Sequence, residues 1–585
     1  MGATGGAAPP DAGPLVHRHG QPLPAVEGAV ELALEDGTLL RVDRGLPPDL
    51  PLGYHDLRPL DGRPAVPLIV APSRCHLPEG LRTWGWAIQL YALRSRESWG
   101  IGDLADLRQL ADWSAMALGA GAVVLNPLHA ALPLVPQEPS PYFPSSRRYR
   151  NPLYLRVEEA PGAAEAGLDV ERLAVEGRAL NAERRIDRDA VFRLKMAALG
   201  GLWARGAAGA DGLARYRVRE GRGLEEFAVF CALAERHGSG WRRWPAEHRH
   251  PASSAVARFA AEQRERVAFH AWLQWLLDEQ LARAGRALRL VTDLAIGFDG
   301  EGGDAWAWQD VLAQGVTVGA PPDDFALEGQ DWGLPPFVPH RLRAAGYGPF
   351  VETVRAGLRH AGGMRVDHVM GLFRLFWVPG GATARNGAYV RYPTDDLLAI
   401  LALESERAGA LVIGEDLGTV APGVRERLFA ERILSTRVLW FEPGPPAGYP
   451  GLSLAAVTTH DLPTVRGLWT GSDLREQEAV GVLPNVAGTE ALRSRLRELT
   501  RLPDDASPDA VALSIHRRLA EAPSVLVAAT LEDVLGAAER PNLPGTTGDR
   551  RANWSLALPK ALEEIETDPR PRAFAEILGR RPPMS

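Results

Sequence analysis

From residue 84 onward, the chain consists mainly of short apolar runs separated by segments with the apolar periodicity of helices. Continuous apolar runs that alternate with helices indicate strands of a buried parallel sheet. Eight such strand-helix units, each ending on polar residues, predict a (β/α)₈ TIM barrel. The runs are WGWAIQLYAL (84–93), GAVVLNPL (121–128), LRLVTDLA (288–295), GMRVDH (363–368), ALVIGEDLG (410–418), TRVLWFE (436–442), SLAAVTTHD (453–461) and SVLVAATLED (524–533).

A doubly wound open sheet is the alternative arrangement of the same elements. No GxGxxG sequence follows the first run. The polar residues also follow many of the runs, whereas an open sheet would concentrate its site at a single switch point. The barrel is therefore favoured.

The gaps between the runs predict inserted, largely helical subdomains in the barrel, which we expect over 81–585. Apolar positions recur at three and four residues within about 151–284, which indicates helices. The gap at about 296–361 contains GAPPDDFALEGQDWGLPPF (319–337), which is too rich in Pro, Gly and Asp for a helix or strand. We expect a long active-site loop there.

The N-terminal residues predict a separate small unit. Residues 1–20 are rich in Gly, Pro and Ala, so we expect a disordered tail. Alternating apolar and polar residues then predict a small N-terminal β-domain over 21–80. It could pack against the barrel or bind carbohydrate, and the lack of an aromatic row favours packing.

Composition and charge narrow the class of protein. Apolar residues make up 45% and charged residues 24%, as in globular proteins. The net charge of -8 offers no basic surface for nucleic acid or a membrane. The N-terminal residues lack the pattern of a secretory signal, and two cysteines cannot form a disulfide framework or a zinc site. We therefore expect a cytoplasmic protein.

Candidate chemistry lies in the carboxylates that end the runs. In GMRVDH, Arg365 and Asp367 share one face of a strand, and the guanidinium favours an ionised carboxylate, which suits a nucleophile. In VIGEDLG, partial burial and the like charges of Glu415 and Asp416 should raise the pKa of one of them, which suits a general acid.

Two further strand ends carry similar groups. His460 and Asp461 end the seventh run, and Asp293 lies in the third. Each group alone is more often an ion pair or a turn than a catalyst. Their shared position at the C-terminal ends of barrel strands favours chemistry, because active sites of this fold lie there. One ionised and one protonated carboxyl group are what glycoside cleavage needs.

Tryptophan gives a weaker indication of the same chemistry. The chain has 16 Trp, and most of them are expected to pack in the barrel wall. Trp332 lies inside the Pro-rich loop, so it is the best candidate for a ring that stacks on sugar.

Longer segments in a consistent order resemble one known family. Together they look like 4-α-glucanotransferases, also called amylomaltases or disproportionating enzymes, of glycoside hydrolase family 77, and most like the bacterial maltodextrin-pathway branch. The segments are SWGIGDLADL (98–107), LNPLHA (125–130), SPYFPSSRRYRNPLYL (140–155), GAPPDDFALEGQDWGLPPF (319–337), MRVDHVMGLFRLFWVP (364–379), VIGEDLGTV (412–420), VTTHDLPTVRGLW (457–469) and NLPGT (542–546).

The resemblance implies roles for particular residues. Asp367 would be the nucleophile, Glu415 the acid/base and Asp461 the third carboxylate that holds the sugar at the cleaved bond. It also implies no metal and no organic cofactor, and α-1,4-glucans and malto-oligosaccharides as partners. The implied substrate-binding residues are Arg365, His368, His460, Asp293, Tyr142 in the SPY segment, and Asp323, Gln330 and Trp332 in the loop over the substrate.

The sequence leaves two other activities open. An α-amylase-like hydrolase would use the same carboxylates in a more open site. A catalytically silent glucan-binding protein would be expected to lack one of the three carboxylates, and all three are present. The third run continues as TDLAIGFDGEGGDAWAW, where many members of the family have a DLPIYV-like sequence, so we expect the binding of distal sugars to differ.

Overall fold

The computed structural model describes residues 13–26, 28–206, 209–322, 328–482, 485–546, 548 and 550–580. At its centre lies a closed barrel of eight parallel strands, ordered β10-β13-β16-β17-β18-β19-β6-β7. No helix in these residues is long and apolar enough to span a lipid bilayer. The strands are β6 (Thr83–Ile88), β7 (Ala122–Leu125), β10 (Arg289–Leu294), β13 (Gly363–Val366), β16 (Leu411–Gly414), β17 (Leu434–Val438), β18 (Ser453–Ala456) and β19 (Leu526–Thr530).

Each of the eight apolar runs supplies or overlaps one barrel strand, so the predicted (β/α)₈ barrel is confirmed and the open sheet is wrong. Strands β7 and β16 are buried along their whole length, as continuous apolar runs require. The barrel closes where β19 pairs with β6, with Val527 opposite Trp84. On the other side of β6, a Cβ on Gly85 would lie 2.0 Å from the carbonyl oxygen of Ala122, so only glycine allows this close pairing with β7.

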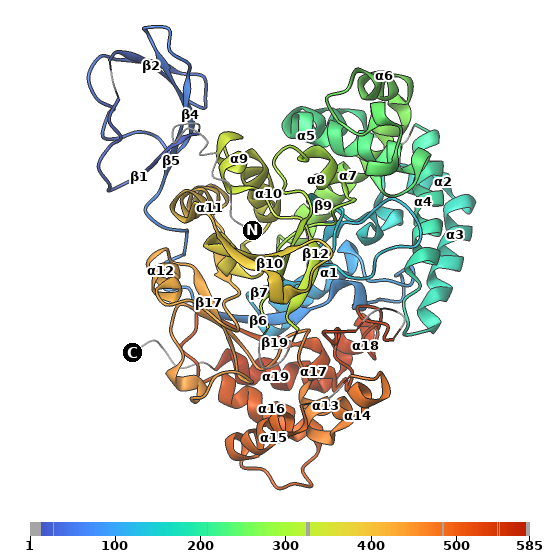
Figure 1. Cartoon of the computed structure of the whole chain (residues 1–585). Coiled ribbons are helices and arrows are strands. Elements are labelled where there is room, and N and C mark those ends of the chain that lie inside the picture. Colours follow the sequence, from blue (N-terminus) through green and yellow to red (C-terminus); the bar gives the residue numbers. More distant parts are fainter. Residues whose placement is uncertain are drawn as a thin grey trace.

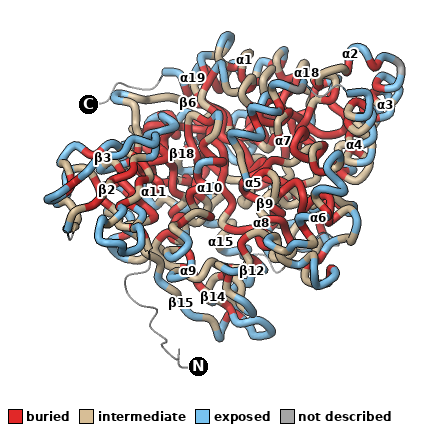
Figure 2. Tube along the Cα trace, turned by 90° about the horizontal axis from the view of Figure 1, so that it is seen from above, coloured by how far each residue is buried: buried red, intermediate tan, exposed pale blue. Residues whose placement is uncertain are grey.

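Helices surround the barrel (Figure 1). Their apolar faces bury the outer side of the strands, and Figure 2 shows that buried residues concentrate along the barrel and the inner sides of these helices. The helices that follow barrel strands or close the chain include α1 (Leu104–Trp113), α10 (Gly348–Leu358), α11 (Thr394–Ala408), α12 (Val424–Ala430), α13 (Val465–Thr470), α16 (Pro508–Leu519), α17 (Leu531–Leu535) and α19 (Pro569–Gly579).

Between β7 and β10 the chain forms a short hairpin and then a set of helices. The hairpin pairs β8 (His129–Ala130) with β9 (Ser146–Arg150). The segments within 151–284 that are predicted to be helical do form helices. The two longest of these helices pack against each other. The helices are α2 (Ala163–Ala166), α3 (Leu168–Ala179), α4 (Arg188–Ala204), α5 (Ala210–His237), α6 (Ser254–Glu262) and α7 (Arg264–Ala284).

The segment expected to be a long loop contains strands and helices. Strands β11 (Val316–Ala320) and β12 (Gln330–Leu334) join β14 (Arg374–Pro379) and β15 (Ala388–Arg391) in an antiparallel sheet, ordered β12-β11-β14-β15. The prediction that 319–337 is neither helix nor strand is therefore wrong at both ends. Helices α8 (Gly303–Ala307) and α9 (Pro339–Ala344) flank the two strands.

Two glycines allow strands β11 and β12 to form, although the glycine content of this segment argues against a strand. A Cβ on Gly319 would lie 2.0 Å from the carbonyl oxygen of Gln330, and the register shifts beside it as in a β-bulge. Gly333 has a φ of +71°, a left-handed conformation that glycine adopts without strain. The prolines that follow, Pro335 and Pro336, lie after β12, where they remove no hydrogen bond from its ladder.

The N-terminal sheet has five strands, ordered β1-β5-β4-β2-β3. They are β1 (Leu15–Arg18), β2 (Val30–Ala33), β3 (Leu39–Val42), β4 (Gly53–Pro59) and β5 (Val66–Ala71). Strand β1 lies within the stretch expected to be a disordered tail, so that expectation is wrong for 15–18, and residues 1–12 lie outside the described residues.

The N-terminal sheet packs against the barrel's outer helices. Arg18 pairs with Glu431 at 2.6 Å, and both side chains are buried. The hydroxyl of Tyr54 donates a hydrogen bond of 2.7 Å to Glu404 on α11. The sheet thus lies beside α11, away from the C-terminal ends of the barrel strands (Figure 1).

Candidate active site

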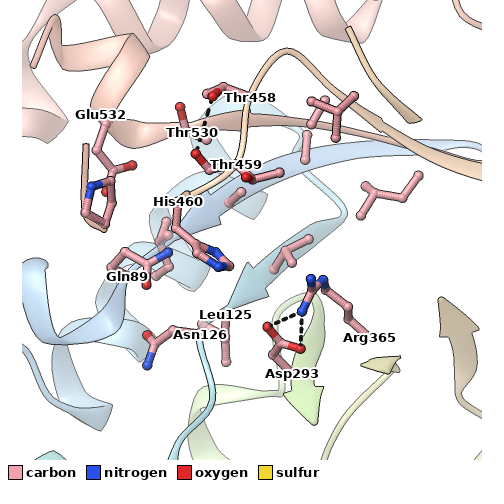
Figure 3. Close-up of a pocket in the computed structure, with 18 of the residues that line it drawn as sticks. Gln89, Leu125, Asn126, Asp293, Arg365, Thr458, Thr459, His460, Thr530 and Glu532 are labelled. Atoms are coloured by element: carbon pink, nitrogen blue, oxygen red, sulfur yellow. Dashed lines mark hydrogen bonds and ion pairs between the residues drawn. The ribbon is translucent and has the colours of Figure 1, made fainter. Parts of the chain in front are cut away.

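The C-terminal end of β13 carries the first group of site residues. The register pairs Arg365 with Asp293 of β10, and the guanidinium donates hydrogen bonds of 2.7 and 2.8 Å to the Asp293 carboxylate (Figure 3). The same guanidinium lies 3.0 Å from an oxygen of Asp367. Arg365 and Asp367 therefore share one side of the strand, as the alternation in GMRVDH predicts. One arginine holds two carboxylates.

The turn after β13 holds the next carboxylate through the backbone. His368 has a φ of 46°, which is rare for a residue other than glycine and is typical of functional sites. In this conformation its backbone N–H donates to Oε2 of Glu415 at 2.9 Å. The N–H of Leu417 donates to Oε1 at 2.7 Å, so both oxygens of Glu415 are positioned.

The surroundings of Glu415 favour its protonated form. Its pKa is raised to about 7 because burial raises it most, Arg365 only partly opposes this, and the charge of Asp367 also raises it. Of the two residues, Glu415 is therefore the one whose pKa is raised. The sequence predicts Asp416 as the like-charged neighbour, but that neighbour is Asp367. Asp416 is buried elsewhere and accepts hydrogen bonds from the N–H of Thr436 and from Arg425. Residues adjacent in an extended segment point to opposite sides, which explains the difference.

The loop after β18 supplies the third carboxylate. Asp461 lies 3.3 Å from Nε2 of His460 and accepts a hydrogen bond of 2.7 Å from the amide of Asn542. Burial raises the pKa of Asp461, but the neighbouring His460 and these hydrogen bonds outweigh burial and hold the pKa below its usual value. Burial lowers the pKa of His460, but Asp461 outweighs it and the pKa is raised. The two groups stabilise each other as an ion pair.

An aromatic cluster borders the same carboxylates. The Tyr142 hydroxyl donates a hydrogen bond of 2.6 Å to Asp293, and burial raises the pKa of Tyr142, so the hydroxyl stays protonated. Its ring centroid lies 5.1 Å from that of His460 and 5.5 Å from that of Trp554. Tyr142, His460 and Trp554 thus form one wall.

These residues open on one cavity of about 710 Å³, which is within the usual range for ligand sites. Asp367, Glu415 and Asp461 all line it, together with residues of β12. From β12, the indole N–H of Trp332 donates to Gln330 at 3.0 Å, and its ring packs edge-on against His368 with centroids 5.3 Å apart. Among the other predicted residues, Tyr142, His368 and His460 line the cavity, Arg365 and Asp293 lie beneath it, and Asp323 lies outside the described residues.

Sequence reasoning missed several residues of this cavity, and two of them contact predicted site residues directly. Asn542 holds Asp461, and Trp554, which has a φ of 59°, packs against His460 with ring centroids 5.1 Å apart. Both follow the last barrel strand, where the strand-end argument did not apply. The NLPGT segment was the available signal for Asn542, whereas no pattern marks Trp554. No group of three or more His, Cys, Asp or Glu in the described part of the chain is placed to hold a metal ion.

Carboxyl groups with contrasting surroundings on the C-terminal face of a (β/α)₈ barrel are the arrangement expected of an enzyme that acts on glycosidic bonds. Comparison with known proteins narrows this class. The chain belongs to the 4-alpha-glucanotransferase family, glycoside hydrolase family 77, whose model matches residues 88–562.

Relatives cover nearly the whole chain. A 4-alpha-glucanotransferase of Mycobacterium tuberculosis is 45% identical, over 94% of this chain and 86% of that protein. One from Haemophilus influenzae is 34% identical, over 88% of this chain and 82% of that protein. The crystal structure of amylomaltase from Corynebacterium glutamicum superposes with a TM-score of 0.84 and 32% identity, covering 97% of this chain and 90% of that one.

Proposed function

We propose that this 4-alpha-glucanotransferase moves a segment of an α-1,4-glucan to the 4-hydroxyl of an acceptor glucan or glucose, with retention at the anomeric carbon. The observation that carries the mechanism is the contrast between two carboxyl groups on one cavity. Asp367 is ion-paired with Arg365, whereas burial raises the pKa of Glu415 to about 7. One can attack as a carboxylate while the other donates a proton.

In the first step Asp367 attacks the anomeric carbon. A bond forms between its carboxylate oxygen and that carbon while the glycosidic C–O bond breaks. Glu415 gives its proton to the departing oxygen, which leaves as the 4-hydroxyl of the released glucan. The product of the step is a covalent β-glucosyl-enzyme.

In the second step the same groups act in reverse. Glu415, now ionised, takes the proton from the 4-hydroxyl of an acceptor sugar. The acceptor oxygen attacks the anomeric carbon, Asp367 leaves as a carboxylate, and the α-linkage is restored. The backbone donors from His368 and Leu417 keep the Glu415 carboxylate in one place through both steps.

The remaining groups would hold the sugar at the cleaved bond. Asp461 is held by His460 and Asn542 and can accept hydrogen bonds from sugar hydroxyls. Arg365 places positive charge beside Asp367, which stabilises the carboxylate when it leaves. Asp293 reaches the sugar side of the barrel through its hydrogen bond with Tyr142.

Transfer requires that an acceptor sugar reaches the intermediate before water. Gln330 and Trp332 on β12 line the cavity, and the Trp332 ring packs against His368, the neighbour of Asp367 in the chain. This position supports a role in favouring transfer over hydrolysis. Cys75 and Cys231 are both buried and free, which supports our proposal that the enzyme works in the reducing cytoplasm.

One incubation with maltotriose tests the proposal. Glucose together with dextrins longer than maltotriose, separated by chromatography, is the expected result. Glucose and maltose without longer products would favour the α-amylase-like hydrolase. No products at all would favour a silent glucan-binding protein.

A further inference from the structure

A second cavity lies inside the barrel. Its volume is about 80 Å³, and it is lined by residues of seven barrel strands and of the loops that follow them. Within the described part of the chain, His460 is the one residue that lines both this interior cavity and the large cavity that holds Asp367 and Glu415. His460 is therefore the shared wall, and polar groups in the interior cavity can act on the sugar site through it.

Glu532 faces the interior cavity. It follows β19 at the start of α17 and is only 8% exposed. Its carboxyl group accepts a hydrogen bond from its own backbone N–H but makes none with another residue in the part of the chain that the structure describes. A carboxyl group buried without such partners is costly, so Glu532 needs either a function or a solvent partner.

Gln89 lines the same cavity and also lacks a hydrogen-bond partner, among the described residues, for a polar side-chain atom. This atom is Oε1, which is buried. Figure 3 shows Glu532, Gln89 and His460 around the one pocket. Buried water commonly forms hydrogen bonds with such polar groups. One water needs about 10–15 Å³, so the interior cavity can hold several waters.

We propose that Glu532 is a positioning residue for His460. Through water in the interior cavity, its carboxyl group accepts a hydrogen bond from the side of the His460 ring that faces away from the glucan. The ring and its charge are thereby held against Asp461 and the sugar at the cleaved bond. This inference rests on the proposed function, because it assigns His460 a contact with the glucan.

The charged groups around His460 make the inference testable by pH. Asp461 faces the ring from its own loop, Asp293 from β10 and Arg365 from β13, with the neutral Tyr142 beside them. Glu532 adds a further carboxyl group from the end of β19.

The sign follows from the charge of Glu532. The pKa of Glu532 is raised to about 7 because burial raises it more than the hydrogen bond from its own backbone N–H lowers it; Asp533 also raises it and His460 lowers it. When ionised, Glu532 favours the protonated imidazole. Its removal should therefore let His460 lose its proton at a lower pH.

The test compares Glu532→Gln with the wild type in maltotriose disproportionation from pH 5 to 9. The value of kcat/KM at pH 7 should fall up to about tenfold, because the neutral amide of glutamine replaces a charged acceptor in this hydrogen bond. Its alkaline limb, which requires both Glu415 and His460 to stay protonated, should move to lower pH by about half a unit. The thermal midpoint should stay near that of the wild type, because glutamine has the same shape.

Glu539→Gln is the matched control. Glu539 lies seven residues further on, pairs with Arg184 at 3.1 Å and does not line the cavity. It should keep the wild-type pH profile.

A second variant removes the water and leaves both side chains in place. Ala528 of β19 lines the cavity, and Ala528→Val fills part of it. We expect a shift of the same sign, and this variant decides the question if Glu532→Gln does not fold. An unchanged pH profile in both variants, even with a uniformly lower kcat, would overturn the proposal. Failure of the wild type to elongate maltotriose would instead overturn the proposed function.

Discussion

Two clusters in this protein each place two carboxyl groups beside one arginine, with different results. One consists of Asp367, Glu415 and Arg365 at the mouth of the barrel, and we call it the open cluster. The other consists of Asp103, Asp106 and Arg156 beside α1, and we call it the closed cluster.

The hydrogen bonds of the closed cluster all stabilise the fold. Asp103 caps α1 by accepting from two backbone N–H groups, and Arg156 donates to both carboxylates at 2.7 Å. Asp106 also accepts from the hydroxyls of Ser95 and Ser98. Both carboxylates are 1% exposed or less, so no ligand can approach them.

The open cluster leaves its carboxylates facing a cavity. Arg365 and the backbone hold them from below, and their other side borders the space of about 710 Å³. Burial raises the pKa of Asp106 to about 6 and that of Glu415 to about 7, so the direction of the shift does not separate the two clusters. A perturbed carboxyl group marks a functional site only when a substrate can reach it.

The comparison predicts the largest effect at Asp367. Asp367→Asn should lower transfer from maltotriose by at least about a thousandfold, since the nucleophile is lost. The unfolding midpoint should change little, because the site and not the core depends on this group. Initial rates and thermal unfolding measure both quantities. A variant with half the wild-type rate would remove Asp367 from the mechanism.

The closed cluster should behave in the opposite way. Arg156→Met leaves the buried Asp106 without an ion pair and Asp103 with only the longer contact of 3.8 Å to Lys195. The protein should be destabilised by about 3–5 kcal/mol. The fraction that remains folded should transfer glucose at the wild-type rate, when denaturant unfolding is used to count folded molecules. Loss of activity per folded molecule would make the closed cluster part of the catalytic machinery.

The pH profile sharpens the assignment of Glu415. A general acid must be protonated, so with a pKa of about 7 kcat/KM should fall as pH rises through 7. The decline should approach tenfold per pH unit. With a maltosyl fluoride donor, whose leaving group needs little protonation, this limb should weaken. An alkaline limb identical for both donors would show that another group causes it.

The smallest expected effect concerns Trp332. If its ring stacks on the acceptor sugar, Trp332→Ala should weaken acceptor capture several-fold, equivalent to about 1 kcal/mol. Water would then capture more of the intermediate. The ratio of new reducing ends to transfer products should rise, and total cleavage should fall less than transfer. If Trp332 only packs against His368, that ratio would stay constant across acceptor concentrations.

The barrel and its carboxylates could be predicted because strand ends converge. Asp367, Glu415 and Asp461 each follow an apolar run, and parallel strands bring their C-terminal ends to one face. The identity of the neighbours could not be predicted in the same way. Asp416 is adjacent to Glu415 in sequence, but the charge that faces Glu415 belongs to Asp367 on another strand.

Other features depend on contacts between distant segments. The pairing of β11 with β12 depends on how Gly319 meets Gln330, which composition does not reveal. Asn542 and Glu532 reach the site region from the segment after β19, and their positions depend on the closed barrel.

The closure of the barrel between β6 and β19 also affects synthesis. These neighbours in space are the first and last barrel strands in the chain. At about 5–20 residues per second, the ribosome makes β19 roughly 20–90 s after β6. During that interval one edge of β6 has no partner strand and is exposed to aggregation. Newly made chains should therefore depend on chaperones that bind nascent polypeptides, most strongly before residue 526 has been added.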